Sequence, residues 1–464
     1  MSEIHKKFLV DSEKLSFDKV HRRKLNFNIG RYDEAVVRGK RQYANLDLAR
    51  KRAAYLKHRL LENLEKYLNE FETNFEKNGG KIIWAQHAEE AVKEILKVIQ
   101  QHDVKLVVKS KSMLTEEIEF NQALEKHNIK SVETDLGEYI VQVAGEKPYH
   151  ILTPAMHKSK EDVAKLFHEK FDLPENSSPS DITQFVRQKL RALFQTADAG
   201  VTGANFLIAD SGSIALTENE GNGMMTFSFP KVHIVVAGIE RLIPSLRDLD
   251  LFWPLLATHG TGQNITVYNS IVSGPRKVGE IDGPNEMYVV LLDNGRSELL
   301  KHPHQRRALS CIRCGACLNA CPVYRSIGGY TYNATYTGPI GSVITPHLKG
   351  MKEYKHLSFA SSLCGKCTEV CPVKINLHEL LLFNRNESVK TGCATWTEKE
   401  AQKIARKAML KRRMMDFGGG KMKNMAMKTF MKNAWGPRRT LPEFATKSFR
   451  QQWIEKHGKN DQGK

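Results

Sequence analysis

Residues 311–322 read CIRCGACLNACP and hold four cysteines followed by a proline. Their spacing, C-x2-C-x2-C-x3-C-P, is that of bacterial ferredoxins, which bind [4Fe–4S] clusters. The matching positions are Cys311, Cys314, Cys317, Cys321 and Pro322. Thiolates two residues apart can wrap a loop around one corner of an Fe4S4 cube, and Gly315 permits the positive φ that such a loop needs. In ferredoxins with two clusters, the fourth cysteine of the motif binds the other cluster.

A second, incomplete copy of the motif lies at residues 361–372, which read SSLCGKCTEVCP. The spacing, the glycine and the proline recur, but Ser361 takes the place of the first cysteine. Cross-pairing of the two motifs predicts that the first cluster is bound by Cys311, Cys314, Cys317 and Cys371. It predicts that the second cluster is bound by Cys321, Cys364 and Cys367.

The fourth iron of the second cluster has three candidate arrangements: it is bound by Ser361, by Cys393 or by no protein side chain. A serine oxygen is a harder and poorer ligand for iron than a thiolate. The second cluster is therefore expected to be labile, to lose an iron and become [3Fe–4S], or to leave an iron open to a substrate.

All eight cysteines of the chain lie between Cys311 and Cys393. Disulfide frameworks are typical of small secreted domains, so this clustering favours metal or redox chemistry. A four-ligand zinc site would leave the third cysteine and both Cys-Pro pairs unexplained. Clusters with a purely structural role are a further alternative, but two clusters close together favour electron transfer. We interpret the nearby histidines as surface or hydrogen-bonding residues: His302, His304 and His378.

The composition describes a globular chain with one unusual end. Its 464 residues, 41% of them hydrophobic, are enough for two or three domains. No stretch approaches the ~18 consecutive apolar residues of a membrane-spanning helix. The first ten residues, MSEIHKKFLV, do not resemble a secretory signal, so the expected location is the cytoplasm. Residues 401–464 hold 17 Lys and Arg against four acidic residues, which is +13 of the total net charge of +18.

Four regions are predicted along the chain. Residues 1–78 form an N-terminal helical segment, in which 46–77 carry an apolar stripe at helical spacing. Residues 79–296 form an α/β domain, 297–395 the cysteine domain and 396–464 the basic, Met-rich tail. A basic amphipathic tail is suited to an anionic membrane surface or to a partner protein. Nucleic acid is not the expected partner, because no fold that binds it is recognised.

Apolar runs alternate with amphipathic helices in the α/β domain, a pattern typical of a parallel sheet. The predicted strands are 81–85, 105–109, 131–134, 150–153, 233–237 and 287–292. Helices are expected through 91–99 and over 113–127. Within 200–218, two apolar runs meet across 209–212, which predicts a β-hairpin added to this sheet.

Two loops of the α/β domain are candidate binding segments. One carries Lys109 and Lys111 between a strand and a helix, where backbone amides and lysines would suit a phosphate or carboxylate. Its alternative is an ordinary solvated loop. Residues 200–223 are rich in glycine, which serves either the close approach of a ligand or tight turns. No GxGxxG follows a strand, so dinucleotide binding is unsupported. If the domain is itself a catalyst, the candidate acids or bases are Glu138, Asp210 and Glu218.

These motifs together resemble those of the lactate utilization protein B family. The segments that carry the resemblance are Cys311–Arg325, Tyr336–Pro346, Leu363–Leu381 and Gly200–Asn222. The resemblance extends over nearly the whole chain, and the family pattern also has three cysteines in its second copy. It implies a lactate-utilization domain with a fold like that of ribose-5-phosphate isomerase and the CoA-transferases. It also implies a role beside companion proteins A and C in oxidising L-lactate to pyruvate.

We therefore expect an α/β lactate-utilization domain, a small α-helical ferredoxin-like domain with two [4Fe–4S] clusters, and a basic tail. The expected function is to relay single electrons between the clusters within a complex that oxidises L-lactate. The chain is then an electron-transfer subunit and not a catalyst alone, and its tail would place it at the inner face of the membrane or on a partner. The alternative is a binding module in which the clusters are structural and the tail holds nucleic acid or membrane. It predicts salt-dependent affinity that is lost without residues 401–464.

Overall fold

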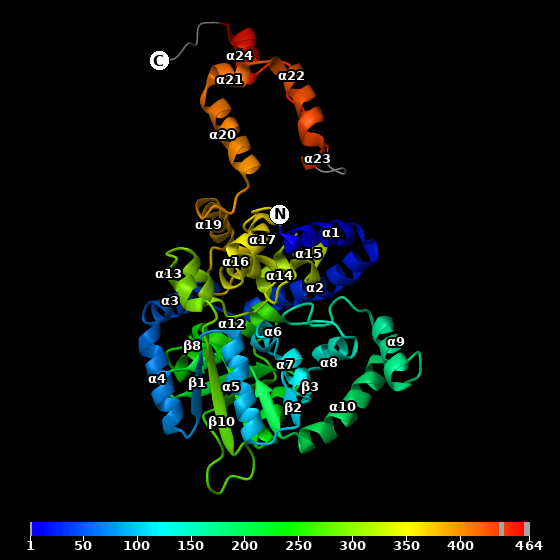
Figure 1. Ribbon diagram of the computed structural model, residues 1–464, viewed down its shortest axis with the longest axis vertical. Coiled ribbons are helices and arrows are strands. Elements are labelled where there is room, and N and C mark those ends of the chain that lie inside the picture. Colours follow the sequence, from blue (N-terminus) through cyan, green and yellow to red (C-terminus); the bar gives the residue numbers. More distant parts are fainter. Residues whose placement is uncertain (1, 436–439, 459–464) are drawn as a thin grey trace. The chain divides into compact units, whose positions relative to one another are not determined.

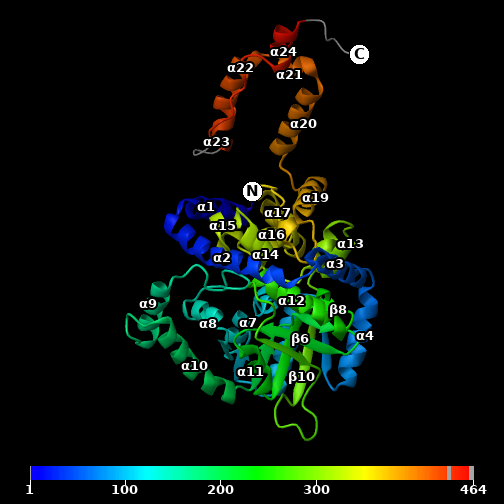
Figure 2. The same ribbon diagram turned by 180° about the vertical axis from the view of Figure 1, so that it is seen from behind.

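The computed structural model describes residues 2–435 and 440–458. The chain divides into two compact units, residues 1–391 and 392–464, and each is described by itself. Figure 1 and Figure 2 show the larger unit from opposite sides.

A six-stranded parallel sheet forms the centre of the larger unit, as the alternation of strands and helices predicts. Its strand order is β1-β10-β7-β4-β2-β3, and every pairing is parallel. The strands are β1 (Lys81–Ala85), β2 (Leu106–Lys109), β3 (Lys130–Glu133), β4 (Ala199–Thr202), β7 (Val232–Gly238) and β10 (Glu286–Leu292). All seven residues of β7 are buried, because helices or strands cover both faces of a parallel sheet.

Alternate residues of β7 face two different hydrophobic cores, as the two-residue period of a strand requires. Ile234 and Val236 pack in a core with helix α5 (Ala88–Gln101), which lies across one face of the sheet in Figure 1. Val235 and Ala237 belong to the core on the opposite face. The helices on the two sides of the sheet are α6 (Met113–Glu117), α7 (Phe120–Lys126), α8 (Leu136–Val143), α9 (Lys160–Phe171), α10 (Pro179–Thr196), α11 (Asn222–Ser228) and α12 (Leu249–Gly260).

A second sheet, with strand order β8-β5-β6-β9, contains the predicted hairpin. Its strands are β5 (Phe206–Ile208), β6 (Ser213–Glu218), β8 (Leu242–Ile243) and β9 (Tyr268–Val272). The antiparallel β5–β6 pair confirms the hairpin, but its expected place in the main sheet is wrong. Figure 2 shows β6 and β8 from the side opposite to that from which Figure 1 shows α5. The strand expected at 150–153 is also wrong, because these residues form turns.

Four helices precede the main sheet. They are α1 (Glu3–Phe17), α2 (Lys19–Gly39), α3 (Leu46–Glu62) and α4 (Leu64–Lys77). The sequence predicts one helix over 46–77, but Asn63, with φ −126° and ψ 34°, interrupts it. Helices α6 and α7 likewise replace a single predicted helix, since Glu119 between them has a φ of 53°. Helix α1 packs against the cysteine-rich part of the unit, beside α15 (Tyr324–Ile327) and α17 (Met351–Phe359) (Figure 1).

The cysteine-rich part consists of short helices. They are α13 (Arg296–Lys301), α14 (Ala316–Ala320), α15 (Tyr324–Ile327), α16 (Gly338–Leu348), α17 (Met351–Phe359), α18 (Lys366–Val370) and α19 (Leu377–Lys390). Residues 338–346 of α16 are all buried, and this helix contacts α14, α17 and α19. The long segment between the two cysteine motifs therefore forms part of the core.

The smaller unit is helical. Its helices are α20 (Trp396–Leu410), α21 (Arg412–Asp416), α22 (Gly419–Ala426), a π-helix at Met427–Met431, α23 (Lys432–Trp435) and α24 (Phe449–His457). Several large apolar side chains are exposed on it: Trp396, Ile404, Met409, Leu410, Phe417, Met425, Phe430 and Phe449. Within the described residues, no helix has the length and hydrophobicity needed to cross a membrane.

Candidate functional site

The two cysteine motifs adopt the same local backbone. Arg313 and Gly315 in the first motif have φ values of 60° and 75°, and Leu363 and Gly365 in the second have 53° and 78°. The short helices α14 and α18 begin directly after these glycines. The left-handed conformation favours glycine, which explains why a glycine follows the second ligand position in both motifs.

The structure brings together the four cysteines predicted for the first cluster. Burial raises the pKa of the Cys314 thiol well above its ordinary value, and the nearby Cys311 and Cys371 thiols raise this pKa further. Cys317 is affected in the same way, by burial first and then by Cys311, Cys314 and Cys371. One cavity is lined by all four cysteines, and most of its other lining residues are apolar, among them Ile312. Such a group, with four thiols and a dry surrounding, fits an iron–sulfur cluster.

The cysteines predicted for the second cluster also lie near one another. Burial, followed by the Cys321 and Cys364 thiols, raises the pKa of Cys367 to about 11. Cys364 is exposed, in contrast to the buried Cys367. Cys367 also raises the pKa of Cys317, so the two groups of thiols adjoin each other. Cys393 belongs to the smaller unit, which begins at residue 392.

Backbone N–H groups donate to sulfur atoms in both motifs. Arg313 N–H donates to Cys311 Sγ at 3.4 Å, and Ile375 N–H donates to Cys371 Sγ at 3.3 Å. Tyr324 N–H donates to Cys321 Sγ at 3.5 Å. Such hydrogen bonds are one of the means by which proteins set cluster potentials. Among the described residues, no three His, Cys, Asp or Glu side chains are grouped as a single metal ion would need.

The histidines near the motifs make the contacts of structural residues. His378 Nδ1 is hydrogen-bonded to Thr368 Oγ1 at 2.7 Å, and the His304 ring stacks on Phe383. The His302 ring contacts that of His347.

A buried ionic network joins the main sheet to the first cysteine motif. Arg296 Nη2 lies 2.8 Å from Glu117 Oε2, and Arg296 Nε lies 2.7 Å from Glu240 Oε2. Glu240 Oε1 in turn lies 3.3 Å from Arg313 Nη2. The Arg313 guanidinium also lies 4.4 Å from the centre of the Tyr336 ring. Two carboxylates thus stand among several buried cations beside the first motif.

The N-terminal helices hold the second motif. Arg50, on α3, donates from Nη2 to the carbonyl oxygens of Cys371 at 2.8 Å and Glu369 at 2.6 Å. Lys374 pairs with Asp47 on the same helix. The N-terminal segment therefore positions the carbonyl of a predicted cluster ligand.

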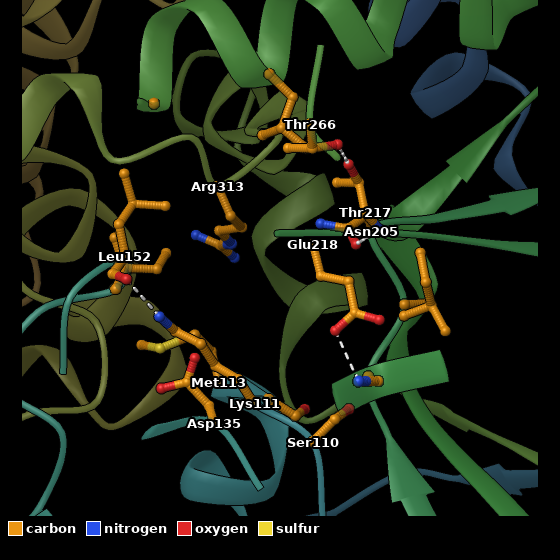
Figure 3. Close-up of a pocket in the computed structure, with 18 of the residues that line it drawn as sticks. Ser110, Lys111, Met113, Asp135, Leu152, Asn205, Thr217, Glu218, Thr266 and Arg313 are labelled. Carbon is orange, nitrogen blue, oxygen red and sulfur yellow. Dashed lines mark hydrogen bonds between the residues drawn. The ribbon is translucent and has the colours of Figure 1, made fainter. Parts of the chain in front are cut away.

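A pocket of about 240 Å³ opens beside the first motif. Loops that follow the carboxyl ends of β2, β4 and β7 contribute to its lining, which is where open parallel sheets bind ligands. Arg313 and Ile151 line both this pocket and the cavity of the four cysteines. Figure 3 shows Lys111, Glu218 and Arg313 directed toward one open space. A Cβ at Gly260, another lining residue, would stand 3.2 Å from the carbonyl oxygen of Cys314.

Of the two lysines in the predicted anion-binding loop, only Lys111 lines this pocket. Lys109 is fully buried and ion-paired with Glu133 at 2.7 Å and Glu116 at 3.3 Å, so its predicted role in binding an anion is wrong. Lys111 lines the pocket and donates from Nζ to the carbonyl oxygen of Leu152 at 2.7 Å. The local sequence pattern does not reveal that the positive charge of Lys109 is paired with these two glutamates.

The three candidate acids or bases lie in different surroundings. Glu218 lines the pocket, and burial raises its pKa. Glu138 is buried, and burial, followed by the charge of Glu133, raises its pKa well above the ordinary value. Asp210 accepts the N–H of Leu246 at 3.0 Å and does not line the pocket. Only Glu218 among them is placed to meet a ligand there.

The glycine-rich segment contributes glycines both to the pocket and to a turn of positive φ. Gly203 and Gly223 line the pocket, and a Cβ at Gly223 would crowd the Glu218 carboxylate at 3.0 Å. Gly212 has a φ of 59° and lies against the backbone of α4. Sequence reasoning missed the two buried arginines of the pocket, Arg241 and Arg313. Arg313 stands inside the cysteine motif, but nothing in its spacing reveals which way its side chain points.

The family models match the two parts of the larger unit. The LUD domain matches residues 68–292, and the 4Fe-4S dicluster domain matches residues 307–375. The chain is therefore an iron–sulfur protein that joins a LUD domain to a 4Fe–4S dicluster domain.

Relatives of known name give the family. Lactate utilization protein B of Bacillus cytotoxicus is 43% identical over 417 residues, covering 87% of each chain. The protein of the same name from Bacillus subtilis is 47% identical over 350 residues, covering 75% of this chain and 73% of the relative. The chain belongs to the lactate utilization protein B family. The crystal structure of a DUF162 family protein from Deinococcus radiodurans matches with a TM-score of 0.29 and 14% identity, covering 49% of this chain and 98% of that chain. A likeness this weak carries no argument.

Proposed function

We propose that this chain is the electron-transfer subunit of an assembly that oxidises L-lactate to pyruvate, and that it relays single electrons between two [4Fe–4S] clusters. The observation that carries the proposal is the grouping of seven cysteines into two adjoining sets. Cys371, from the second motif, lies with the first set, and Cys321, from the first motif, lies with the second. The family name supports lactate as the source of the electrons.

Cys311, Cys314, Cys317 and Cys371 would hold the first cluster, and Cys321, Cys364 and Cys367 the second. Clusters of this type accept and release one electron at a time. The chain's own groups would tune this chemistry. Apolar side chains such as Ile312 and Ile340 line the first cavity and limit water. Backbone N–H groups donate to the sulfurs, and the cation Arg313 lies close enough to Cys311 for their charges to interact.

The companions of the relay would be proteins of the lactate utilization A and C types. The basic tail, residues 396–464, would dock the chain to such a companion or to the inner face of the membrane. Its exposed apolar side chains, which include Trp396 and Phe430, support a docking role.

The test is the iron and acid-labile sulfide content of anaerobically purified protein, with EPR of the oxidised and reduced forms. About eight irons per chain, the sum of two cubane clusters, are expected. Four or fewer after reconstitution would reject the relay and leave one cluster or a structural role. Zinc without iron would reject the proposal altogether.

A second experiment tests the source of the electrons. The EPR signals of the reduced clusters should develop on addition of L-lactate when the A- and C-type companions are present. Dithionite provides the control for full reduction. Clusters that dithionite reduces but lactate with companions does not would contradict a role in lactate oxidation.

A further inference from the structure

The pocket beside the first cysteine motif contains two buried arginines that could hold an anion. Arg241 and Arg313 both line it, and each residue is only 8% exposed. Arg241 Nε and both Nε and Nη1 of Arg313 have no hydrogen-bond partner. Each buried N–H without a partner costs free energy, so a ligand that accepts hydrogen bonds would be stabilised there.

The available carboxylate does not neutralise both arginines. Glu240 is shared between Arg296, at 2.7 Å, and Arg313, at 3.3 Å. Arg241 and Arg313 are close enough for each charge to oppose the other. An anion between them would relieve this repulsion and fill the unused donors, since an arginine fork matches a carboxylate well.

The pocket is also lined by carboxylates. Glu218 accepts the N–H groups of Gly223 at 2.6 Å and Met224 at 2.8 Å, which fixes its carboxylate. Glu220 also lines the pocket. These carboxylates accept hydrogen bonds and would repel a second negative charge. The pocket therefore combines a site for one anionic group with an acceptor for a hydroxyl donor.

The size of the pocket limits its ligand. At about 240 Å³, it is smaller than the ~300–1,000 Å³ of typical cofactor and drug-sized sites. A small metabolite fits this volume better than a nucleotide does.

We propose that this pocket binds a small α-hydroxycarboxylate, with the carboxylate on Arg241 and Arg313 and the hydroxyl directed to Glu218. The inference rests on the proposed function, because it places the substrate of the assembly in this chain, next to the first cluster. A simpler alternative is that the two arginines only balance the charge of the first cluster. The presence of both arginines and carboxylates in the lining favours binding of an α-hydroxycarboxylate over this alternative. That simpler role predicts no selectivity among small acids.

The test is calorimetric titration of the anaerobic full-length protein with its clusters bound. The ligands are L-lactate, propionate, which lacks the hydroxyl, L-lactamide, which lacks the charge, and inorganic phosphate. L-lactate should bind, and propionate should bind about tenfold more weakly, which is ~1.4 kcal/mol. Lactamide and phosphate should give no measurable heat. Absence of lactate binding, or preference for phosphate, would overturn the proposal.

Variants locate the site. Arg241→Gln should weaken L-lactate binding by about tenfold or more, because a charge-assisted hydrogen bond is lost. Arg247→Gln is the matched control, since this arginine is exposed and outside the pocket. Lys111→Met provides a second pocket variant in case Arg241→Gln does not fold, and it should also weaken binding. Unchanged lactate affinity in a folded pocket variant would overturn the assignment.

The outcome can be separated from that of the electron relay. Iron content and EPR are measured on the same samples. Eight irons and reducible clusters without lactate binding would reject the pocket assignment and leave the relay intact. Lactate binding in protein that holds no reducible clusters would reject the relay and support the pocket.

Discussion

The hydroxyl of Ser361 stands in the second cysteine motif where the thiol of Cys311 stands in the first. Ser361 Oγ accepts the N–H of Leu363 at 3.1 Å, and Cys311 Sγ accepts the N–H of Arg313 at 3.4 Å. Both donors are two residues further along the chain, and both have a positive φ. The two loops therefore present their first ligand position in the same way, and the difference between them is oxygen in place of sulfur.

This equivalence predicts that Ser361→Cys completes the second cluster with a fourth thiolate. On oxidation, the wild-type protein should lose an iron and give the EPR signal of a [3Fe–4S] cluster, because serine is the harder ligand. The Ser361→Cys variant should keep about eight irons. Ser361→Ala is the control and should resemble the wild type or lose iron faster. Equal iron loss from Ser361→Cys and the wild type would show that this position does not face the cluster.

Each motif is predicted to supply one cysteine to the cluster of the other motif, so single cysteine variants should show which cluster each cysteine binds. Cys371→Ala, although it alters the second motif, should abolish the first cluster, and Cys321→Ala should abolish the second. Each should retain about four irons in the remaining cluster. EPR signals that differ between the two variants and add up to the wild-type spectrum would support the assignment. If Cys371→Ala and Cys364→Ala abolish the same signal, the motifs are not cross-paired.

The buried network around Glu240 predicts a large loss of stability in Glu240→Gln. Its carboxylate contacts Arg296 and Arg313 in the interior. Removal of one partner from a buried ion pair typically costs ~3–5 kcal/mol, because the remaining charge is left uncompensated. Urea denaturation measures the difference. The control is Glu94→Gln in the exposed pair with Lys97, where a change below ~0.5 kcal/mol is expected. Equal effects of the two substitutions would contradict the model of a buried network.

The same glutamate predicts a dependence of stability on pH. Burial alone would raise the pKa of Glu240, but the charges of Arg296, Arg313 and Arg241 lower it to about 2, from 4.5. A carboxyl group with a lowered folded-state pKa stabilises the fold above its unfolded pKa and loses this contribution as the pH falls. The free energy of unfolding of the wild type minus that of Glu240→Gln should thus be constant above pH ~4.5 and decrease toward pH ~2. A difference that grows on acidification would refute this assignment.

The separation of the two compact units predicts that removal of residues 392–464 leaves the iron–sulfur sites intact. All seven predicted ligands lie in residues 1–391. The truncated protein should keep the iron content and EPR spectrum of the full chain. If the tail docks the chain, the truncation should also reduce co-purification with the companion proteins. Loss of the second cluster in the truncated protein would instead point to Cys393 as a ligand.

The periodicity of the sequence predicts most of the main sheet but not its surroundings. Strands β1, β7 and β10 lie within one residue of their predicted bounds at each end, because a strand buried on both faces is a compact apolar run. Helices α1 and α2 lie within the N-terminal helical segment predicted over residues 1–78, but the sequence pattern does not give their bounds, since packing on other segments stabilises them. The hairpin was apparent from local pattern, whereas its membership of a second sheet depends on which strands pair with it.

The sequence alone determined the cysteine motifs, because the loop around a cluster needs ligands two residues apart whatever surrounds it. It also determined the family and the alternation that produces a parallel sheet. Only the tertiary structure decided that the Lys109 ammonium group is buried in ion pairs, whereas the Lys111 side chain lines a pocket. It alone placed Arg241 and Arg313 together beside the cysteines, because these residues are 72 positions apart in the sequence. The spacing of residues within one loop determines which ligands that loop can offer. Which charged side chains from distant segments lie together depends instead on the tertiary fold.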